Sequence, residues 1–288
     1  MPELPEVEIL KRSLNKSIKS KKIIKININN PNLRYKVQKN FKKILKKKVI
    51  SKVSRVSKYL ILHFSSNKKK LLIHLGMSGT IHLVIEKSKI NTNASFYKLS
   101  NLPLKHNHII FFLNNKIKLV YNDPRRFGYM KIVDTNFMKY KPLNKLGPDP
   151  FSSKFNLIYF KKYIKNKKKN VKNLLMDQKF VSGLGNIYVN EVLFSCKINP
   201  SKSILNLSEK NIKDIIKKTK KILKKAILFG GSSIRDFKKI DGKSGNFQQK
   251  FMVYGKNNKN CPRNNCEGLL KKIFLSNRSV FFASLNSM

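Results

Sequence analysis

The chain of 288 residues has few acidic side chains, few cysteines and no long apolar run. Only 14 Asp and Glu stand against 63 Lys and Arg, which gives a formal net charge of +49. The three cysteines, Cys196, Cys261 and Cys266, are too few for a disulfide framework and suit a reducing cytoplasm. The absence of an apolar run of roughly 18 residues predicts no transmembrane helix, and the N-terminus shows no signal-peptide pattern.

The excess of positive charge favours a polyanionic partner, and nucleic acid is the first candidate. The excess is mostly lysine, however, and it accompanies many Asn and Ile, a composition that an AT-rich coding sequence also produces on solvated faces. Composition therefore leaves both interpretations open. The length fits two or three compact units, and a hydrophobic content of 41% is enough for buried cores.

The first part of the chain reads as one helix followed by short strands. Apolar side chains recur at spacings of three and four over residues 3–18, which predicts an amphipathic helix. Alternating β-type runs and two hairpin-flanking runs around Asn114-Asn115 predict strands. The runs are 22–28, 59–64, 71–79, 108–113 and 118–121. Residues 1–135 are therefore predicted to form a β-sandwich or barrel preceded by a helix.

The second part of the chain changes character after a Pro/Gly-rich stretch, which predicts a linker over 136–152. Helical patterns follow over 171–178, over 186–196 and after Ser208, where Gly230-Gly231 is predicted to end the last helix. These patterns predict a helical domain over 153–231. The polar, glycine-containing segment 232–288 ends in short apolar runs that predict a β-hairpin.

The N-terminal sequence MPELPEVE places three carboxylates on an otherwise basic chain. If the initiator methionine is removed, Pro2 presents a secondary amine that can attack an aldehyde-like carbon and form an iminium ion. Glu3 beside it can act as an acid or a base. The alternative is structural, with Pro2 starting a helix whose dipole the glutamates complement.

MPELPEVE resembles the start of the formamidopyrimidine-DNA glycosylases, the bacterial repair enzymes that excise oxidised purines. Further segments resemble this family in the right order along the chain, from residue 2 to about residue 282. They are SKYL (57–60), HLGMSG (74–79), KHNH (105–108), DPRRFG (123–128), KKKNVKNLLMD (167–177), GLGNIYVNE (183–191) and RDFKKIDGKSGNFQQKFMVYGK (235–256). The resemblance implies an α+β multidomain fold, with an N-terminal β-sandwich and leading helix, a helix–two-turn–helix domain and a C-terminal β-hairpin finger.

The resemblance also implies a catalytic set. Pro2 is the expected nucleophile, Glu3 handles protons, and Glu6 orients the terminus. Lys58 contacts DNA at the lesion, and Arg278 on the finger contacts a phosphate and assists the later elimination. The implied activity is that of a glycosylase and AP lyase that removes 8-oxoguanine and formamidopyrimidines from duplex DNA by β,δ-elimination.

A second implied set binds DNA. Base flipping leaves a hole in the stack, and Met77, Arg125 and Phe127 match the residues that fill it. His106 is placed near the DNA backbone, and Lys167 stands at a phosphate-contacting position. Asn186 follows the glycines of GLGN, where free backbone N–H groups at a helix start suit an anion.

The resemblance breaks in the finger, where the family usually carries four cysteines in two CxxC pairs. This chain has CPRNNC (261–266) and places Ala283 and Asn286 where the second pair would stand. Two thiols, Cys261 and Cys266, do not make a tetrahedral zinc site. We therefore expect no metal and no cofactor, with the finger held as an apolar hairpin.

The expected partner is damaged double-stranded DNA, bound by a monomer in the cytoplasm in association with the nucleoid. Two alternatives stay open at this point. One is an oxidised-pyrimidine glycosylase of the same superfamily, which the MPELPEVE start and the Met77, Arg125 and Phe127 set disfavour. The other is a non-catalytic DNA-binding remnant, which the altered finger suggests and the intact Pro2 and Glu3 oppose.

Overall fold

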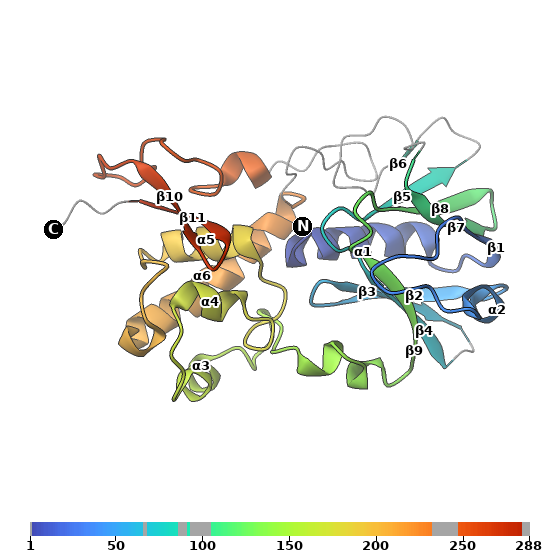
Figure 1. Ribbon diagram of the computed structural model, residues 1–288, viewed down its shortest axis with the longest axis horizontal. Helices are drawn as coiled ribbons and strands as arrows, with labels where there is room; N and C mark the ends of the chain where they lie inside the picture. The colour runs from blue at the N-terminus through green and yellow to red at the C-terminus, as the bar shows by residue number, and fades with distance from the viewer. Residues whose placement is uncertain (1, 66–67, 86–90, 93–104, 232–246, 284–288) are drawn as a thin grey trace. The chain divides into compact units, whose positions relative to one another are not determined.

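The computed structural model describes residues 2–65, 68–85, 91–92, 105–231 and 247–283 (Figure 1). The chain divides into two compact units. Unit 1 comprises Met1–Asn144 and Ile227–Gln248, and unit 2 comprises Lys145–Ala226 and Gln249–Met288. The segment 235–256 resembles the family's loop that covers the flipped base, and its residues 235–246 lie outside the described residues, as does Asn286. The four-part division made from the sequence stays a prediction.

Unit 1 is a β-sandwich with a leading helix, α1 (Leu4–Ile18). One sheet has the strand order β1-β7-β8-β5-β6 and the other the order β2-β3-β4-β9, and all pairs are antiparallel. The strands are β1 (Ile23–Ile28), β2 (Ile50–Val56), β3 (Tyr59–Phe64), β4 (Lys69–His74), β5 (Thr80–Ile85), β6 (Asn91–Thr92), β7 (Asn107–Leu113), β8 (Ile117–Asn122) and β9 (Tyr129–Asp134), with the short helix α2 (Phe41–Leu45).

The core of unit 1 lies where α1 and the inner faces of the sheets meet. Val7, Leu10, Leu14 and Ile18, the face predicted from their spacing, are fully buried. They pack with alternate strand residues into one continuous apolar cluster, as expected when one stripe of a helix and one face of each sheet are apolar. The N-terminal end of α1 is thereby fixed to the sandwich.

Unit 2 carries four helices and a hairpin among its described residues. The helices are α3 (Leu157–Ile164), α4 (Val171–Met176), α5 (Asn186–Ser195) and α6 (Glu209–Leu228), and the hairpin pairs β10 (Leu270–Leu275) with β11 (Arg278–Ala283). The last two residues of α6 belong to unit 1. The strand β11 lies along α5 (Figure 1). A small apolar cluster that includes Phe194, Leu270 and Phe281 joins the hairpin to this helix.

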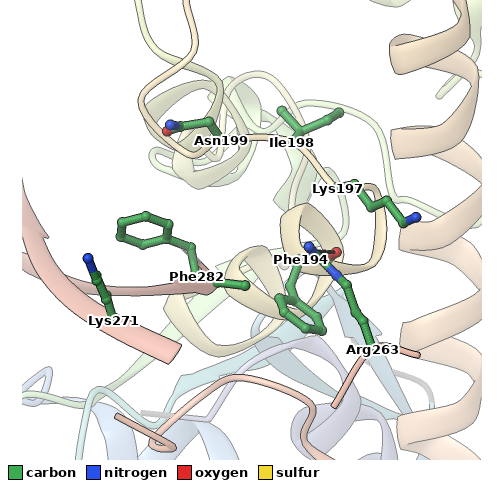
Figure 2. Close-up of a pocket in the computed structure, with 8 residues that line it drawn as sticks. Phe194, Lys197, Ile198, Asn199, Arg263, Lys271 and Phe282 are labelled. Atoms are coloured by element: carbon green, nitrogen blue, oxygen red, sulfur yellow. Dashed lines mark hydrogen bonds between the residues drawn. The ribbon is translucent and has the colours of Figure 1, made fainter. Parts of the chain in front are cut away.

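A shallow cavity of about 280 Å³ opens at the C-terminal end of α5 (Figure 2). Arg263, from the segment between the two finger cysteines, donates to the Phe194 carbonyl at 2.6 Å, and its guanidinium lies 4.0 Å from the centre of the Phe194 ring. A cation suits the carbonyl end of a helix and an aromatic face. Arg263 therefore fastens the cysteine segment directly to α5.

The α+β prediction, with its sandwich, helices and terminal hairpin, is confirmed. The helix predicted over 3–18 begins one residue later, and the last long helix ends at Leu228, just before Gly230 and Gly231, which both have positive φ. Among the residues that the structure describes, no helix has the length and hydropathy needed to cross a membrane.

Candidate active site and nucleic-acid interface

The N-terminal carboxylates form the start of α1. Glu3 is the N-cap, and its backbone N–H donates to the Glu6 carboxylate at 2.9 Å, while the Glu3 side chain accepts from the Glu6 backbone in a reciprocal capping box. Both side chains are almost fully buried, and Pro2 before them is buried too. The structural role weighed from the sequence is therefore present, and it holds both carboxylates beside residue 2. Met1 lies outside the described residues.

Gly231, in the second segment of unit 1, lies close to this turn. Its φ of +82° is in the left-handed region, and a side chain there would meet Ile9 at 3.0 Å and Glu6 at 3.4 Å. Only glycine suits both the backbone conformation and the space. The Gly230-Gly231 pair therefore ends a helix and also admits the chain close to the acidic turn.

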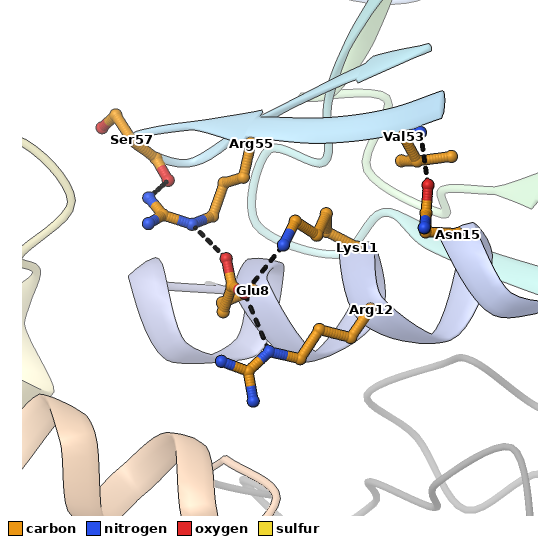
Figure 3. A network of polar contacts seen from close by, with 7 residues as sticks. All are labelled: Glu8, Lys11, Arg12, Asn15, Val53, Arg55 and Ser57. Atoms are coloured by element: carbon orange, nitrogen blue, oxygen red, sulfur yellow. Dashed lines mark hydrogen bonds and ion pairs between the residues drawn. The ribbon is translucent and has the colours of Figure 1, made fainter. Parts of the chain in front are cut away.

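Glu8 connects α1 to the strand β2 through Arg55 (Figure 3). Its carboxylate accepts from Lys11 Nζ at 3.0 Å, Arg12 Nε at 2.9 Å and Arg55 Nε at 2.9 Å, and Arg55 also donates to the Ser57 carbonyl at 2.9 Å. Burial alone would raise the pKa of Glu8, but the hydrogen bonds from Arg55, Lys11 and Arg12 outweigh it and hold the pKa below 4.5.

Lys58 lies in the tight turn between β2 and β3. Ser57 before it has a φ of +54°, and the Arg55 bond to the Ser57 carbonyl holds this conformation. Lys58 is only 7% exposed. Glu8 and Arg55 therefore link the position of Lys58 to the helix that begins with Glu3.

His74, at the end of β4, shares the electrostatic environment of Lys58. Burial first, then the charges of Lys58 and Arg34, lower the pKa of His74 to about 4, so the ring is neutral at physiological pH. Its Nδ1 accepts the Gly76 amide at 3.2 Å, which places the proton of the neutral ring on Nε2. Sequence reasoning assigned no role to His74, although it begins the HLGMSG motif.

A cavity of about 780 Å³ opens beside these residues, and all three predicted wedge residues line it. Met77 and Phe127 are 43% and 42% exposed, which is unusual for apolar side chains of this size. Arg125 lies over the Phe127 ring at 4.5 Å from its centre. The other residues that line the cavity are Asn32, Leu33, Arg34, His74, Gly76 and Arg126. A thioether, a ring and a guanidinium thus project together at one mouth.

Two loops meet closely to build that mouth. A Cβ on Gly76, whose φ is +62°, would lie 2.4 Å from the Gly128 nitrogen, and a Cβ on Gly128 would lie 2.0 Å from the Tyr121 hydroxyl. The fully buried Asp123 accepts hydrogen bonds from Ser78 Oγ, the Tyr121 hydroxyl and the Gly128 amide. Asp123 therefore holds the loop of Arg125 and Phe127 against the loop of Met77.

The remaining predicted DNA-binding residues lie at varied places. His106 in unit 1 is exposed and has a φ of +67°. Lys167 in unit 2 is half-buried, with its ammonium over the Tyr163 ring. Asn186 is the first residue of α5, after Gly183 with a φ of +98°, and Gln178 holds the preceding loop through the Gly183 amide and the Leu184 carbonyl.

Arg278 begins β11, directly after the two-residue turn of the hairpin, and its side chain is exposed. The base of the finger is held by α5. Glu191 accepts three consecutive backbone amides, of Met252, Val253 and Tyr254, at 2.8 to 3.0 Å, and Asn190 accepts the Phe281 amide at 2.8 Å. These buried side chains replace the backbone partners that the segment lacks.

The finger does not fit a zinc ion. Cys261 is buried in the apolar cluster with Leu270, Phe281 and Ala283, and Cys266 packs against that cluster. Burial raises the pKa of the Cys261 thiol, and a hydrogen bond from this thiol lowers the pKa of Cys266, so the pair readily supplies one thiolate rather than two. Within the described ranges, no group of three or more His, Cys, Asp or Glu side chains could hold a metal.

The structure groups the predicted residues by unit. Unit 1 contains the predicted residues Pro2, Glu3, Glu6, Lys58, Met77, His106, Arg125 and Phe127. Unit 2 contains Lys167, Asn186 and Arg278. The protein is strongly basic, exposes three wedge residues at a cavity and begins a helix directly after a glycine loop. These features define the class of protein that binds nucleic acid and inserts side chains into it.

Comparison with known proteins identifies the family within that class. Residues 1–130 match the formamidopyrimidine-DNA glycosylase N-terminal domain, and residues 146–238 match the H2TH domain of the same enzymes. Formamidopyrimidine-DNA glycosylases of Roseobacter denitrificans and Rickettsia felis are 37% and 38% identical over 99% and 98% of this chain, and 99% and 96% of theirs.

Solved structures agree. A Lactococcus lactis Fpg complex with DNA that contains an abasic site has a TM-score of 0.84 at 34% identity, covering 98% of this chain and 97% of that one. A variant of the same enzyme with Fapy-dG DNA has a TM-score of 0.85 at 34% identity, covering 98% of both chains. The chain belongs to the formamidopyrimidine-DNA glycosylase family. The sequence analysis predicted this family and a base-excision repair glycosylase with AP-lyase activity, and both predictions are confirmed.

Proposed function

We propose that this enzyme excises oxidised purines from damaged duplex DNA with Pro2 as its nucleophile, and then cleaves the strand. The observation that carries the proposal is the cavity mouth of unit 1, where Met77, Arg125 and Phe127 project together. Such a trio can occupy the space that a flipped base leaves in the stack. DNA complexes of the Lactococcus relatives support the choice of substrate.

Removal of Met1 gives Pro2 a free secondary amine. Its nitrogen attacks the sugar C1′, the glycosidic bond breaks, and the base leaves with a proton supplied with the help of Glu3. The C1′–O4′ bond then breaks, O4′ takes up a proton, and the opened sugar carries an iminium at C1′. This iminium acidifies the C2′ proton, so that loss of this proton expels the 3′ phosphate and a second elimination expels the 5′ phosphate. Glu6 holds the Glu3 amide and so orients the terminus.

Cations supply the contacts to the DNA backbone. Lys58, held by the Arg55–Ser57 bond, is the residue of unit 1 that assists at the lesion, and Arg278 contacts a phosphate from the finger. Further contacts to the DNA backbone come from His106, Lys167 and Asn186. The neutral ring of His74 faces the same cavity as the wedge residues, and its Nε2–H is a further donor to a phosphate.

We also propose that the enzyme works without zinc, as a monomer, in the cytoplasm with the nucleoid. The apolar surroundings of Cys261 and the Arg263 bond to α5 support a finger that needs no metal. Three cysteines that are all free suit a reducing compartment.

Replacement of the proposed nucleophile tests the mechanism. Pro2→Gly should lower cleavage of duplex DNA that contains 8-oxoguanine by at least about a hundredfold, because a primary amine in a looser backbone is a poorer nucleophile in this position. Binding to the same duplex, measured by fluorescence anisotropy, should change by less than about threefold. An equal loss of binding and cleavage would contradict the assigned role of Pro2.

A further inference from the structure

The turn that presents Arg278 is held by side chains from two helices of unit 2. The turn comprises Ser276 and Asn277, with φ of +50° and +58°, between Leu275 and Arg278. Two consecutive residues in this left-handed region make the tight connection that suits the twist of a hairpin. Neither residue is glycine, so contacts from outside the hairpin contribute to holding the conformation.

Lys172 on α4 supplies the first of these contacts. It is 1% exposed and ranks among the largest fully buried side chains of the described chain. Its ammonium donates to the carbonyl oxygens of Arg278 at 3.2 Å and Ser279 at 3.3 Å. Among the described residues, these two carbonyls are its hydrogen-bond partners, and no carboxylate pairs with it.

A buried ammonium held only by carbonyl oxygens is costly, because two partial charges replace a full hydration shell. Burial, and then the positive charge of Arg278, lower the pKa of Lys172 to about 8. A methionine or leucine would fill the same space without that cost. The polar contact to the Arg278–Ser279 backbone is therefore the property that a lysine adds at this position.

Two asparagines complete the arrangement. Asn186 Nδ2 donates to the same Ser279 carbonyl at 2.9 Å, and Asn173 Nδ2 donates to Ser276 Oγ at 2.9 Å. The base of α4 is itself fixed, since the Asn170 side chain caps the helix through the Asn173 amide. Donors from α4 and α5 thus reach both sides of the turn, while the Arg278 side chain stays exposed.

We propose that Lys172, Asn173 and Asn186 form a turn clamp that positions Arg278 for its contact with DNA, and that Lys172 is its central positioning residue. The proposal rests on the role of Arg278 given under Proposed function. With the backbone of Arg278 fixed, only side-chain torsions have to be ordered when the guanidinium meets a phosphate. A freed turn would add backbone entropy to that cost.

A double-mutant cycle tests the clamp, with kcat and KM for strand cleavage of duplex DNA that contains an abasic site. Lys172→Met should lower kcat about tenfold with little change in KM, and Lys172→Arg should recover part of the loss. In an Arg278→Ala background, Lys172→Met should have almost no further effect, because the residue that it positions is gone. Lys162→Met removes an exposed lysine of α3 as the matched control and should resemble the wild type.

Hydrogen exchange gives a readout that does not depend on catalysis. Amides of residues 276–282 should exchange at least about tenfold faster in Lys172→Met than in the wild type, while Arg278→Ala should leave them unchanged. Asn173→Ala changes a half-exposed side chain and tests the clamp if Lys172→Met fails to fold. It should show smaller changes in the same directions.

Two results would overturn the turn clamp. One is that the losses of kcat from Lys172→Met and Arg278→Ala add fully in the double mutant. The other is that the amide exchange rates of the turn change in neither Lys172→Met nor Asn173→Ala. Failure of the wild-type enzyme to cleave the duplex would instead contradict the proposed function. In that case the exchange measurement still decides whether the clamp holds the turn.

Discussion

At the scale of single residues, a few buried polar groups decide the geometry of the cavity mouth. Asp123 is the clearest example, because it accepts from a serine, a tyrosine and a backbone amide that come from three parts of the loop region. The motif DPRRFG indicates a loop that resembles the family, but it does not reveal these partners. They are contributed by residues up to 45 positions away in the sequence.

Asp123→Ala should lower the free energy of unfolding by about 3 kcal/mol, since it leaves the Gly128 amide and two hydroxyl groups without their buried acceptor. Urea denaturation followed by circular dichroism measures this loss. Asp134→Ala, at an exposed carboxylate paired with Lys69, is the control and should leave the midpoint close to that of the wild type. Similar midpoints for both variants would argue against Asp123 as the organiser of the loops.

At the scale of helices and strands, hydrophobic periodicity predicted much of the architecture. The spacing of Val7, Leu10, Leu14 and Ile18 was enough to predict α1, because this helix buries that one face. The alternation in YLILHF predicted β3, although this strand buries Ile61 on its second face too. The strand β2 was missed, since the apolar residues of ISKVSRV recur every third residue instead of alternating, and a register shift between Ile50 and Lys52 interrupts the strand pairing. A hydrophobic pattern does not report on strands of that kind.

The site shows the same division. Motifs predicted Met77, Arg125 and Phe127, and the structure brings them to one cavity. His74 was missed although it lies in a matched motif, because its neutral state depends on burial and then on the charges of Lys58 and Arg34, which come from other segments. Lys172 was missed because its partners lie 106 and 107 positions away in the chain. Long-range contacts of this kind leave no local signal.

The link between α1 and β2 gives a prediction with a defined pH dependence. Glu8→Gln should cost about 2 kcal/mol of stability at neutral pH, because it removes the carboxylate that accepts from the largely buried Arg55. The folded-state pKa of Glu8 lies below 4.5, so its contribution is present above pH 4.5 and disappears as the pH falls through the folded-state value.

Denaturant titrations at several pH values check this. The difference between wild type and Glu8→Gln should be constant near neutrality and should narrow in acid below pH 4.5. Glu267→Gln, at an exposed carboxylate outside this network, should follow the wild type throughout. A difference that widens in acid would contradict the ion-pair network of Figure 3.

At the scale of the whole molecule, the formal charge of +49 fits a protein that binds DNA. Composition alone did not decide this, because an AT-rich coding sequence also produces a large excess of lysine and a high net charge. The matched motifs and the related formamidopyrimidine-DNA glycosylases show that the charge belongs to a DNA-binding protein. The acidic N-terminus is then explained as the turn that holds Pro2 and Glu3 within a basic protein.

The finger gives a prediction for the metal content of the whole enzyme. Purified protein should contain far less than one zinc per chain by atomic emission, and prolonged dialysis against EDTA should leave cleavage of abasic DNA unchanged, because Arg263 and the α5 side chains hold the finger. One zinc per chain with loss of activity on dialysis would contradict this account.

Borohydride trapping tests the central claim most directly. The enzyme is incubated with a duplex that contains 8-oxoguanine opposite cytosine, reduced with borohydride and digested, and the cross-linked peptide is mapped by mass spectrometry. We expect a reduced covalent adduct on Pro2 at the N-terminus, which requires removal of Met1 and an iminium intermediate. Tight binding of the duplex without an adduct, also with abasic and thymine glycol DNA, would contradict the account and favour a DNA-binding protein without catalysis.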